Sequence, residues 1–216
     1  MKSIAIDGPS GSGKSTVAKA LAEKLGMLHL DTGAMYRMLA WKADAAGIPN
    51  DDTEALEKLA GRLQFSIEGH ELRESGAPLP AAIRAQQFAK AASVISAIPG
   101  VRKEMQEKQK DLAIRYSLIM DGRDIGTCVI PETPYKFYLD ANVEERARRR
   151  YEQGEKTRYT FEEVLAAMKE RDTQDMNRAI APLTIAEGAI VIDNTNLSVQ
   201  ETVDLMMEFV EAKDAL

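Results

Sequence analysis

The stretch Gly8-Pro9-Ser10-Gly11-Ser12-Gly13-Lys14-Ser15 decides the fold of this chain, because it matches the phosphate-loop pattern G-x-x-x-x-G-K-[ST] at every fixed position. Glycines permit positive φ angles and close backbone approach, so successive N–H groups can turn toward an anion. Lys14 adds a positive charge for the β- and γ-phosphates, and the Ser15 hydroxyl is a hard oxygen ligand for Mg²⁺. We therefore expect a nucleoside triphosphate to bind at Gly8, Pro9, Ser10, Gly11, Ser12, Gly13, Lys14, Ser15 and Thr16.

The segments on either side of this loop agree with that role. Residues 3–7 form a short apolar run that is typical of a buried strand. After Lys14, apolar residues recur with helical spacing as far as Leu25, and Gly26 is suited to end the helix. The alternative is an ordinary glycine–serine turn before a helix, and the order of strand, loop and helix disfavours it.

Four further apolar runs read as strands that alternate with helical patterns. They are residues 27–30, 118–121, 135–139 and 189–193. Strands that alternate with helices are typical of a parallel sheet. The sequence therefore predicts an α/β fold with a five-stranded parallel sheet and helices on both of its faces.

Residues 63–97 have a different texture. Short alternating pieces broken by Gly69 and Gly76 run through residues 63–79, which indicates a local antiparallel hairpin. An alanine-rich helix is expected over residues 81–97, and a long polar helix over 101–113. We interpret residues 63–97 as an insert in the α/β core.

Acidic and basic residues follow the predicted strands at their carboxyl ends, the edge where ligands bind in open α/β sheets. Asp31 and Thr32 follow the second strand, although either could simply cap the next helix. Asp121 ends the third strand and could hold Mg²⁺ through water. The Arg123–Asp124 pair comes next on a glycine-flanked loop, where a ligand contact is favoured over a surface ion pair.

Two later segments are candidates for a closing element. Residues 146–158 are polar, rich in arginine and interrupted by Gly154, which is typical of a mobile lid over phosphates, although a solvated charged face is the alternative. Arg171, Asp175 and Arg178 have spacings that predict one shared helical face. That face is either a self-satisfied ion ladder or a polar surface for a phosphate and a sugar.

Composition limits the function classes. The 216 residues carry 28 Lys and Arg against 34 Asp and Glu, a net charge of −6, which argues against a general binder of nucleic acid or anionic membrane. The one cysteine, Cys128, excludes an internal disulfide framework. No apolar run approaches a membrane span and no signal peptide is evident, so we expect a cytoplasmic protein and, by default, a monomer. His29 and His70 are assigned no role.

Together these features predict a P-loop kinase. Its parts would be the five-stranded core, the antiparallel hairpin insert and a short helical lid. A GTPase switch is disfavoured because residues 41–44 (Trp-Lys-Ala-Asp) lack the asparagine of the base-reading motif. A zinc-bearing lid is disfavoured by the single cysteine. We predict the core at residues 1–62, 98–145 and 176–216, the nucleoside monophosphate-binding insert at 63–97, and the lid at 146–175.

Four motifs and the insert of residues 63–97 resemble the bacterial cytidylate kinases, and the similarity runs nearly end to end. The motifs are residues 8–16, residues 31–37 (Asp-Thr-Gly-x-x-Tyr-Arg), residues 121–127 (Asp-Gly-Arg-Asp-x-Gly-Thr) and residues 171–178 (Arg-Asp-x-x-Asp-x-Asn-Arg). The resemblance implies phosphoryl transfer from ATP, with Mg²⁺, to CMP or dCMP. Metal contacts are expected at Ser15 and, through water, at Asp121.

The resemblance also implies individual roles. Arg37, Arg123 and Arg178 would hold the acceptor phosphate, Ser93, Arg102 and Asp124 would read the cytosine, and Arg171 and Asp175 would meet the sugar. The expected CMP-binding residues are Thr32, Arg37, Ser93, Arg102, Arg123, Asp124, Arg171, Asp175 and Arg178. The residues expected to support the chemistry itself are Lys14, Arg123, Arg171 and Arg178.

Two other interpretations remain open from the sequence. The chain could be a P-loop kinase for another nucleoside monophosphate or small acceptor. It could also be a non-enzymatic nucleotide-binding module, which would leave Arg123–Asp124 and residues 171–178 without a purpose.

Overall fold

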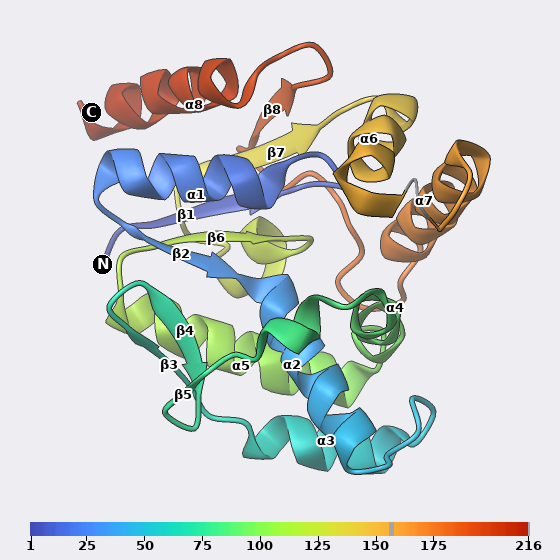
Figure 1. The fold of residues 1–216 in the computed structure, drawn as a ribbon. Coiled ribbons are helices and arrows are strands. Elements are labelled where there is room, and N and C mark those ends of the chain that lie inside the picture. Colours follow the sequence, from blue (N-terminus) through green and yellow to red (C-terminus); the bar gives the residue numbers. More distant parts are fainter. Residues whose placement is uncertain (156–157, 216) are drawn as a thin grey trace.

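The computed structural model describes residues 1–155 and 158–215. Its central element is a five-stranded sheet in the order β2-β6-β1-β7-β8, in which every neighbouring pair is parallel (Figure 1). The strands are β1 (Ser3–Asp7), β2 (Leu28–Asp31), β6 (Leu118–Gly122), β7 (Lys136–Asp140) and β8 (Ile190–Asp193). The predicted five-stranded parallel sheet is confirmed.

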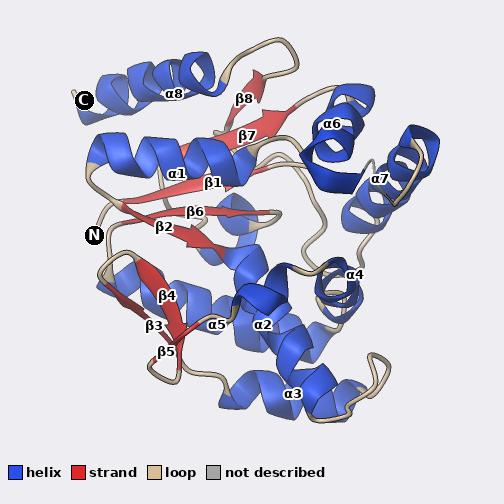
Figure 2. Ribbon diagram, in the orientation of Figure 1, coloured by secondary structure: helices blue, strands red, loops and turns tan. Residues whose placement is uncertain are grey.

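Helices cover both faces of this sheet because its strands alternate their buried side chains between two cores (Figure 2). Ile4 and Ile6 point to a core shared with α1 (Lys14–Leu25) and α8 (Val199–Asp214). Ala5 belongs to a larger core on the opposite face. The helices that form that core are α2 (Thr32–Ala45), α3 (Thr53–Arg62), α4 (Gln86–Ile95) and α5 (Pro99–Arg115).

A second, antiparallel sheet has the order β3-β4-β5, which confirms the predicted antiparallel insert. Its strands are β3 (Phe65–Glu68), β4 (Glu71–Glu74) and β5 (Ala77–Pro78). The prediction of one helix over residues 81–97 is wrong. A 3₁₀-helix at Ala81–Arg84 is separated from α4 by Ala85, whose ψ of 144° is extended. The break lets Ile83 and Phe88, which would diverge on a continuous helix, enter the same core.

The elements that follow the strands gather at one end of the sheet. Figure 1 shows α4, α6 (Val143–Arg150) and α7 (Phe161–Met176) beyond the arrowheads of the parallel strands. Residues 122–126 differ from the predicted loop, because β6 continues through Gly122 and Ile125–Val129 forms one turn of π-helix. Of the predicted lid, residues 146–155 and 158–175 are described; they comprise most of α6, the π-helical turn Tyr151–Glu155 and most of α7, and residues 156–157 lie outside the described residues.

Within the ranges that the structure describes, no helix combines the length and the apolar character needed to span a bilayer.

Candidate active site

The phosphate loop adopts a conformation that only glycine tolerates at its first position. Gly8 has a φ of +149°, and a Cβ there would lie 2.0 Å from the carbonyl oxygen of Leu139 on β7. Gly13 has a φ of 86° and is the N-cap of α1, so the helix begins at Lys14 with its positive end at the loop. The loop therefore fits tightly against the sheet with its N–H groups at a helix N-terminus, a ready site for an anion.

Lys14 is buried and rests on the loop itself. Its Nζ donates to the Pro9 carbonyl at 2.6 Å and lies 3.4 Å from Ser12 Oγ. Burial, followed by repulsion from Arg123, holds the pKa of the Lys14 ammonium well below its usual value of 10.5. An anion in front of the loop would relieve both effects, so this lysine is suited to a phosphate.

Two side chains from distant parts of the chain hold the backbone of the loop. Arg146 of α6 donates from Nη1 to the Ser10 carbonyl at 2.9 Å and pairs with Asp172 of α7 at 2.7 Å. Asn194, just after β8, donates from Nδ2 to the Ser12 carbonyl at 2.9 Å. We call these two contacts the loop straps. They fix the carbonyls of the loop away from the space that its N–H groups face.

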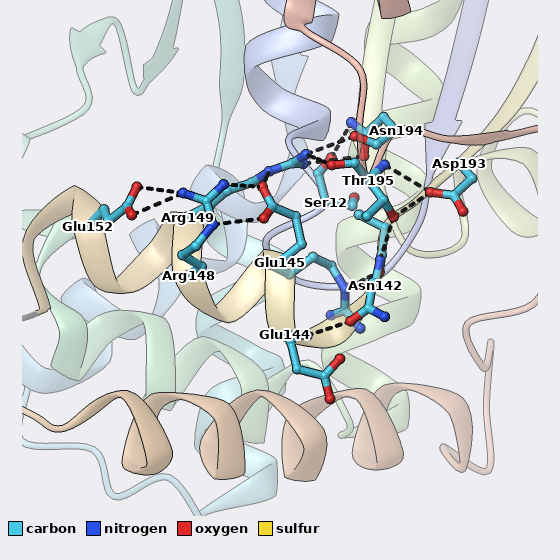
Figure 3. Close-up of polar contacts among 12 residues, drawn as sticks. Ser12, Asn142, Glu144, Glu145, Arg148, Arg149, Glu152, Asp193, Asn194 and Thr195 are labelled. Carbon is cyan, nitrogen blue, oxygen red and sulfur yellow. Dashed lines mark hydrogen bonds and ion pairs between the residues drawn. The ribbon is translucent and has the colours of Figure 1, made fainter.

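Arg149 joins the second strap to the lid helix. Its guanidinium donates to the Asn194 carbonyl at 2.8 Å and to Asn194 Oδ1 at 3.3 Å, while its Nε donates to Glu145 at 2.8 Å (Figure 3). Arg148, one residue earlier, pairs with the same Glu145 carboxylate and with Glu152, and its side chain is exposed. Of these two arginines, Arg149 thus links α6 to Asn194, whereas Arg148 belongs to the solvated face of the helix.

A hydroxyl and a carboxylate meet at the start of α1. Ser15 Oγ donates to Asp121 Oδ2 at 2.6 Å, and His29 Nε2 lies 2.6 Å from Asp121 Oδ1. Burial alone would raise the pKa of Asp121, but the hydrogen bonds with His29 and Ser15 lower it below its usual 3.8. The sequence assigned no role to His29, and the structure places it in contact with the carboxylate that the sequence assigned to the metal. Its place in a strand gave no indication of that partner.

The opposite side of the cleft is lined with arginines. Arg123 Nε pairs with Asp175 Oδ2 at 2.8 Å, and Arg37 pairs with Asp31 at 2.7 Å. Three buried guanidinium nitrogens of cleft-lining residues have no hydrogen-bond partner within the described part of the chain: Arg37 Nε, Arg171 Nε and Arg178 Nη2. We call the five residues Arg37, Arg123, Arg171, Asp175 and Arg178 the arginine wall.

Charge accumulates on the arginine wall. Burial, followed by repulsion from Arg123, lowers the pKa of Arg171 to about 10. Burial and then repulsion from Arg102 lower the pKa of Arg178. Asp175 offsets part of this charge: burial alone would raise its pKa, but Arg123 and Arg171 lower it. Buried donors without partners beside mutually repelling cations are the features of an anion site.

The shared helical face that the spacing predicted for Arg171, Asp175 and Arg178 is wrong in one respect. Helix α7 ends at Met176, and Asn177 is its C-cap, so Arg178 lies beyond the helix. Its side chain is nevertheless held beside Asp175, because Arg178 Nε donates to the Asp175 carbonyl at 3.3 Å. The turn after the helix thus brings all three to one place.

At the far end of the cleft, a buried ion pair crosses from α5 to the turn after β6. Arg102, which is 2% exposed, donates from Nη1 to Asp124 Oδ2 at 2.8 Å and from Nε to the Ser96 carbonyl at 2.9 Å. Its guanidinium lies 5.7 Å from the centre of the Tyr36 ring. This end offers a donor and an acceptor side by side, as a planar base edge requires.

Lys14, Ser15, Asp121, the arginine wall and the Arg102–Asp124 pair line one cleft of about 470 Å³. It brings together every predicted CMP-binding residue and, of the loop, Ser10, Gly11, Gly13, Lys14, Ser15 and Thr16, whereas Gly8, Pro9 and Ser12 are not on its surface. Of the other lining residues, Gly33 and Gly122 belong to the motifs quoted above and Arg149, Arg150 and Gln153 to the predicted lid, whereas the sequence did not single out Ala89, Ala92 and Ser96. The antiparallel sheet contributes nothing to this lining, so the insert reaches the cleft through α4.

Comparisons with known proteins agree with one another on the family. Residues 4–212 match the family model described as "Cytidylate kinase". A curated cytidylate kinase from Caldanaerobacter subterraneus subsp. tengcongensis is 45% identical over 207 residues, which cover 95% of this chain and 92% of that protein. One from Pasteurella multocida is 42% identical over 214 residues, covering 96% and 94%.

Solved structures support the fold class. A shikimate kinase from Bacteroides thetaiotaomicron has a TM-score of 0.52 at 14% identity and covers 97% of this chain and 98% of its own. A shikimate kinase from Acinetobacter baumannii has a TM-score of 0.52 at 17% identity and covers 99% and 94%. At these identities the likeness extends to the P-loop kinase fold.

Proposed function

The chain belongs to the cytidylate kinase family, and from that premise we propose how its cleft transfers the γ-phosphoryl group of ATP to CMP or dCMP. One observation carries the proposal: a phosphate loop and a wall of arginines, whose buried N–H groups include three without a partner among the described residues, face the same cleft. Two polyanions must meet end to end in this reaction, and few other reactions require cationic surfaces on both sides of one space.

On the loop side, the triphosphate of ATP would lie on the N–H groups of residues 8–16, with Lys14 at the β- and γ-phosphates. The Ser15 hydroxyl and the Asp121 carboxylate, 2.6 Å apart, fit Mg²⁺, because this ion is usually bound through one or two carboxylates, hard oxygens and substrate phosphates. When bound, Mg²⁺ neutralises charge on the phosphates. His29 would orient Asp121 for this purpose.

On the opposite side, Arg37, Arg123 and Arg178 would hold the phosphate of CMP. Each lines the cleft, and Arg37 and Arg178 each bear a buried nitrogen that has no partner in the described part of the chain. Arg171 and Asp175 would meet the sugar, with Asp175 shared between Arg123 and a hydroxyl. Guanidinium groups suit this task because they present paired donors in the plane of a phosphate.

The base end would select cytosine by its hydrogen-bonding pattern. Asp124 is an acceptor and Arg102 a donor, and cytosine presents an amino donor where uracil presents a carbonyl oxygen. Ser93 lines the same end of the cleft. Uracil would place its oxygen against a carboxylate, so UMP is expected to be a poorer acceptor than CMP.

The acceptor phosphate is already an anion, so the reaction needs no strong general base. The task of the residues is to align the two phosphates and to support the charge on the transferred group, through Lys14, the loop N–H groups and the arginines. Water must be excluded to prevent hydrolysis of ATP. Tyr159, which follows the lid turn, donates to Gln86 of α4 at 3.1 Å and thereby joins the lid to the insert across the cleft.

The test is a coupled assay of ADP release across CMP, dCMP, UMP, dTMP, AMP and small hydroxylated acceptors. We expect multiple turnovers with CMP or dCMP and much slower turnover with UMP. A kinase for another acceptor would show its highest kcat/KM elsewhere in this panel, and a nucleotide-binding module would bind ATP without turnover. Either result would refute the proposal.

Further expectations extend the proposal. We propose that residues 63–97 and 146–175 close as separate bodies over a core made of residues 1–62, 98–145 and 176–216. We also propose that the protein acts as a monomer in the cytoplasm, where ATP and CMP are both present.

A further inference from the structure

The carboxylate that would face the cytosine is held by a residue that is not part of the cleft lining. Asp124 Oδ2 accepts one hydrogen bond from Arg102 Nη1 at 2.8 Å and a second from Gln106 Nε2 at 2.7 Å. Gln106 is half-buried and lies one turn after Arg102 on α5. One oxygen of the carboxylate is thus bound from two directions by the same helix.

The two oxygens of the Asp124 carboxylate therefore have different surroundings. A carboxylate has two oxygens, each with lone pairs for hydrogen bonds. Both α5 donors reach Oδ2, which leaves Oδ1 as the oxygen that Asp124 can offer to a ligand in the cleft it lines. The base edge would therefore meet an acceptor of fixed position.

Arg102 is restrained independently of Gln106. Its Nε donates to the Ser96 carbonyl at 2.9 Å, and its guanidinium lies over the Tyr36 ring. A single bond from Arg102 would still allow the carboxylate of Asp124 to turn about its own axis. The second donor removes that freedom, because two donors on one oxygen fix the direction of the carboxylate plane.

We propose that Gln106 is a positioning residue for base discrimination: by holding Asp124 Oδ2, it directs Oδ1 toward the amino group of cytosine and against the carbonyl oxygen of uracil. This inference rests on the proposed function, since it concerns the base end of the same cleft. Gln106 acts through Asp124 and does not touch the substrate.

The experiment replaces Gln106 by methionine, which has a similar length and no donor. The matched control is Gln109→Met, the same change three residues later on α5, where Nε2 is buried and has no partner among the described residues. Initial rates are measured with CMP and with UMP at saturating ATP. We expect Gln106→Met to lower kcat/KM for CMP about tenfold, mainly through KM, and to lower the CMP-to-UMP ratio by a similar factor. KM for ATP and the ratio in Gln109→Met are expected to stay within about twofold of the wild type.

The inference is overturned if folded Gln106→Met has the wild-type ratio of kcat/KM for CMP to kcat/KM for UMP. Equal losses of kcat/KM on both nucleotides would give this result. If Gln106→Met does not fold, Gln106→Glu serves the same test, because a second carboxylate beside Asp124 would displace it and lower the ratio. An unchanged ratio in that variant overturns the inference as well. A wild-type enzyme without turnover on CMP would instead refute the proposed function, so the two failures are distinguishable.

Discussion

On one side of the cleft, the protein satisfies the polar groups of the phosphate loop with its own side chains, whereas on the other side the arginine wall retains buried donors without partners. The loop carbonyls of Ser10 and Ser12 are bound by Arg146 and Asn194, and Lys14 rests on Pro9. Across the cleft, Arg171 and Arg178 carry buried nitrogens that no described residue accepts.

This difference has a consequence for the order of events in catalysis. A loop held by its own contacts is formed before the nucleotide arrives, so ATP encounters a rigid surface. The arginine wall is under mutual repulsion, and the anionic phosphate of CMP would relieve it. Binding of the acceptor should therefore stabilise the closed arrangement more than binding of ATP does, which would protect ATP from water until CMP is present.

The most severe test of the loop side is Lys14→Ala. We expect kcat to fall by about 10³-fold or more, because the variant loses the charge that supports the transferred phosphoryl group. The protein should keep its melting temperature, since the contacts of Lys14 are within the loop. Lys19→Ala on the exposed face of α1 is the control and should behave as the wild type. Near-normal turnover in Lys14→Ala would contradict the role given to the loop.

The buried carboxylate of Asp7 provides a second test, through the pH dependence of the free energy of unfolding. It ends β1, the strand before the loop, and its carboxylate accepts the N–H groups of Ile125 and Gly126, just beyond Arg123. Burial raises the pKa of Asp7 to about 6, although those two hydrogen bonds partly oppose the shift. A raised carboxyl pKa favours the folded state most at low pH, below the unfolded value of 3.8, and this contribution is lost as pH rises through about 6.

The measurement is the free energy of unfolding of the wild type and of Asp7→Asn at a series of pH values. The stability of the wild type relative to the variant should fall by up to about 3 kcal/mol between about pH 4 and pH 7. The lost acceptor adds a constant offset, so the slope is the informative quantity. Parallel curves would show that Asp7 titrates alike in the folded and unfolded chain.

Arg178→Met tests the opposite side. Removing the Arg178 guanidinium should lower kcat/KM for CMP by about 10²-fold, because a charge-assisted contact to the phosphate is lost, while KM for ATP stays near the wild-type value. Arg148→Met is the matched control, since Arg148 is an exposed arginine paired with glutamates on the lid helix. If ATP binding alone changed in Arg178→Met, the acceptor phosphate would lie elsewhere.

The sequence predicted most of the two sides because their residues lie in continuous motifs. The phosphate loop is one stretch of chain, and its glycine spacing expresses the backbone geometry directly. Arg123 and Asp124 were placed in the cleft because they follow a strand at the carboxyl edge of the sheet, where ligands bind. The parallel strands were located as short apolar runs, because strands that are covered on both faces are apolar along their whole length.

The contacts that support these motifs were beyond such reasoning. Asn194 reaches Ser12 across 182 residues, and His29 reaches Asp121 across 92. No local pattern encodes a partner at that distance, and Asn194 reads as an ordinary turn residue after a strand. The break at Ala85 was missed for a related reason: helix propensity favoured continuity, and the packing of Ile83 and Phe88 in one core overrode it.

The smallest predicted effect, Asn194→Ala, sharpens the comparison by loosening one loop strap. The change removes the hydrogen bond to the Ser12 carbonyl, while the backbone carbonyl of residue 194 can still hold Arg149. A less restrained loop should raise KM for ATP by about tenfold and leave KM for CMP unchanged, the reverse of the Arg178→Met pattern. Asn196→Ala, an exposed asparagine two residues later, is the control. If Asn194→Ala raised KM for CMP and KM for ATP equally, the strap would support the whole cleft, and the separation of the two sides would not hold.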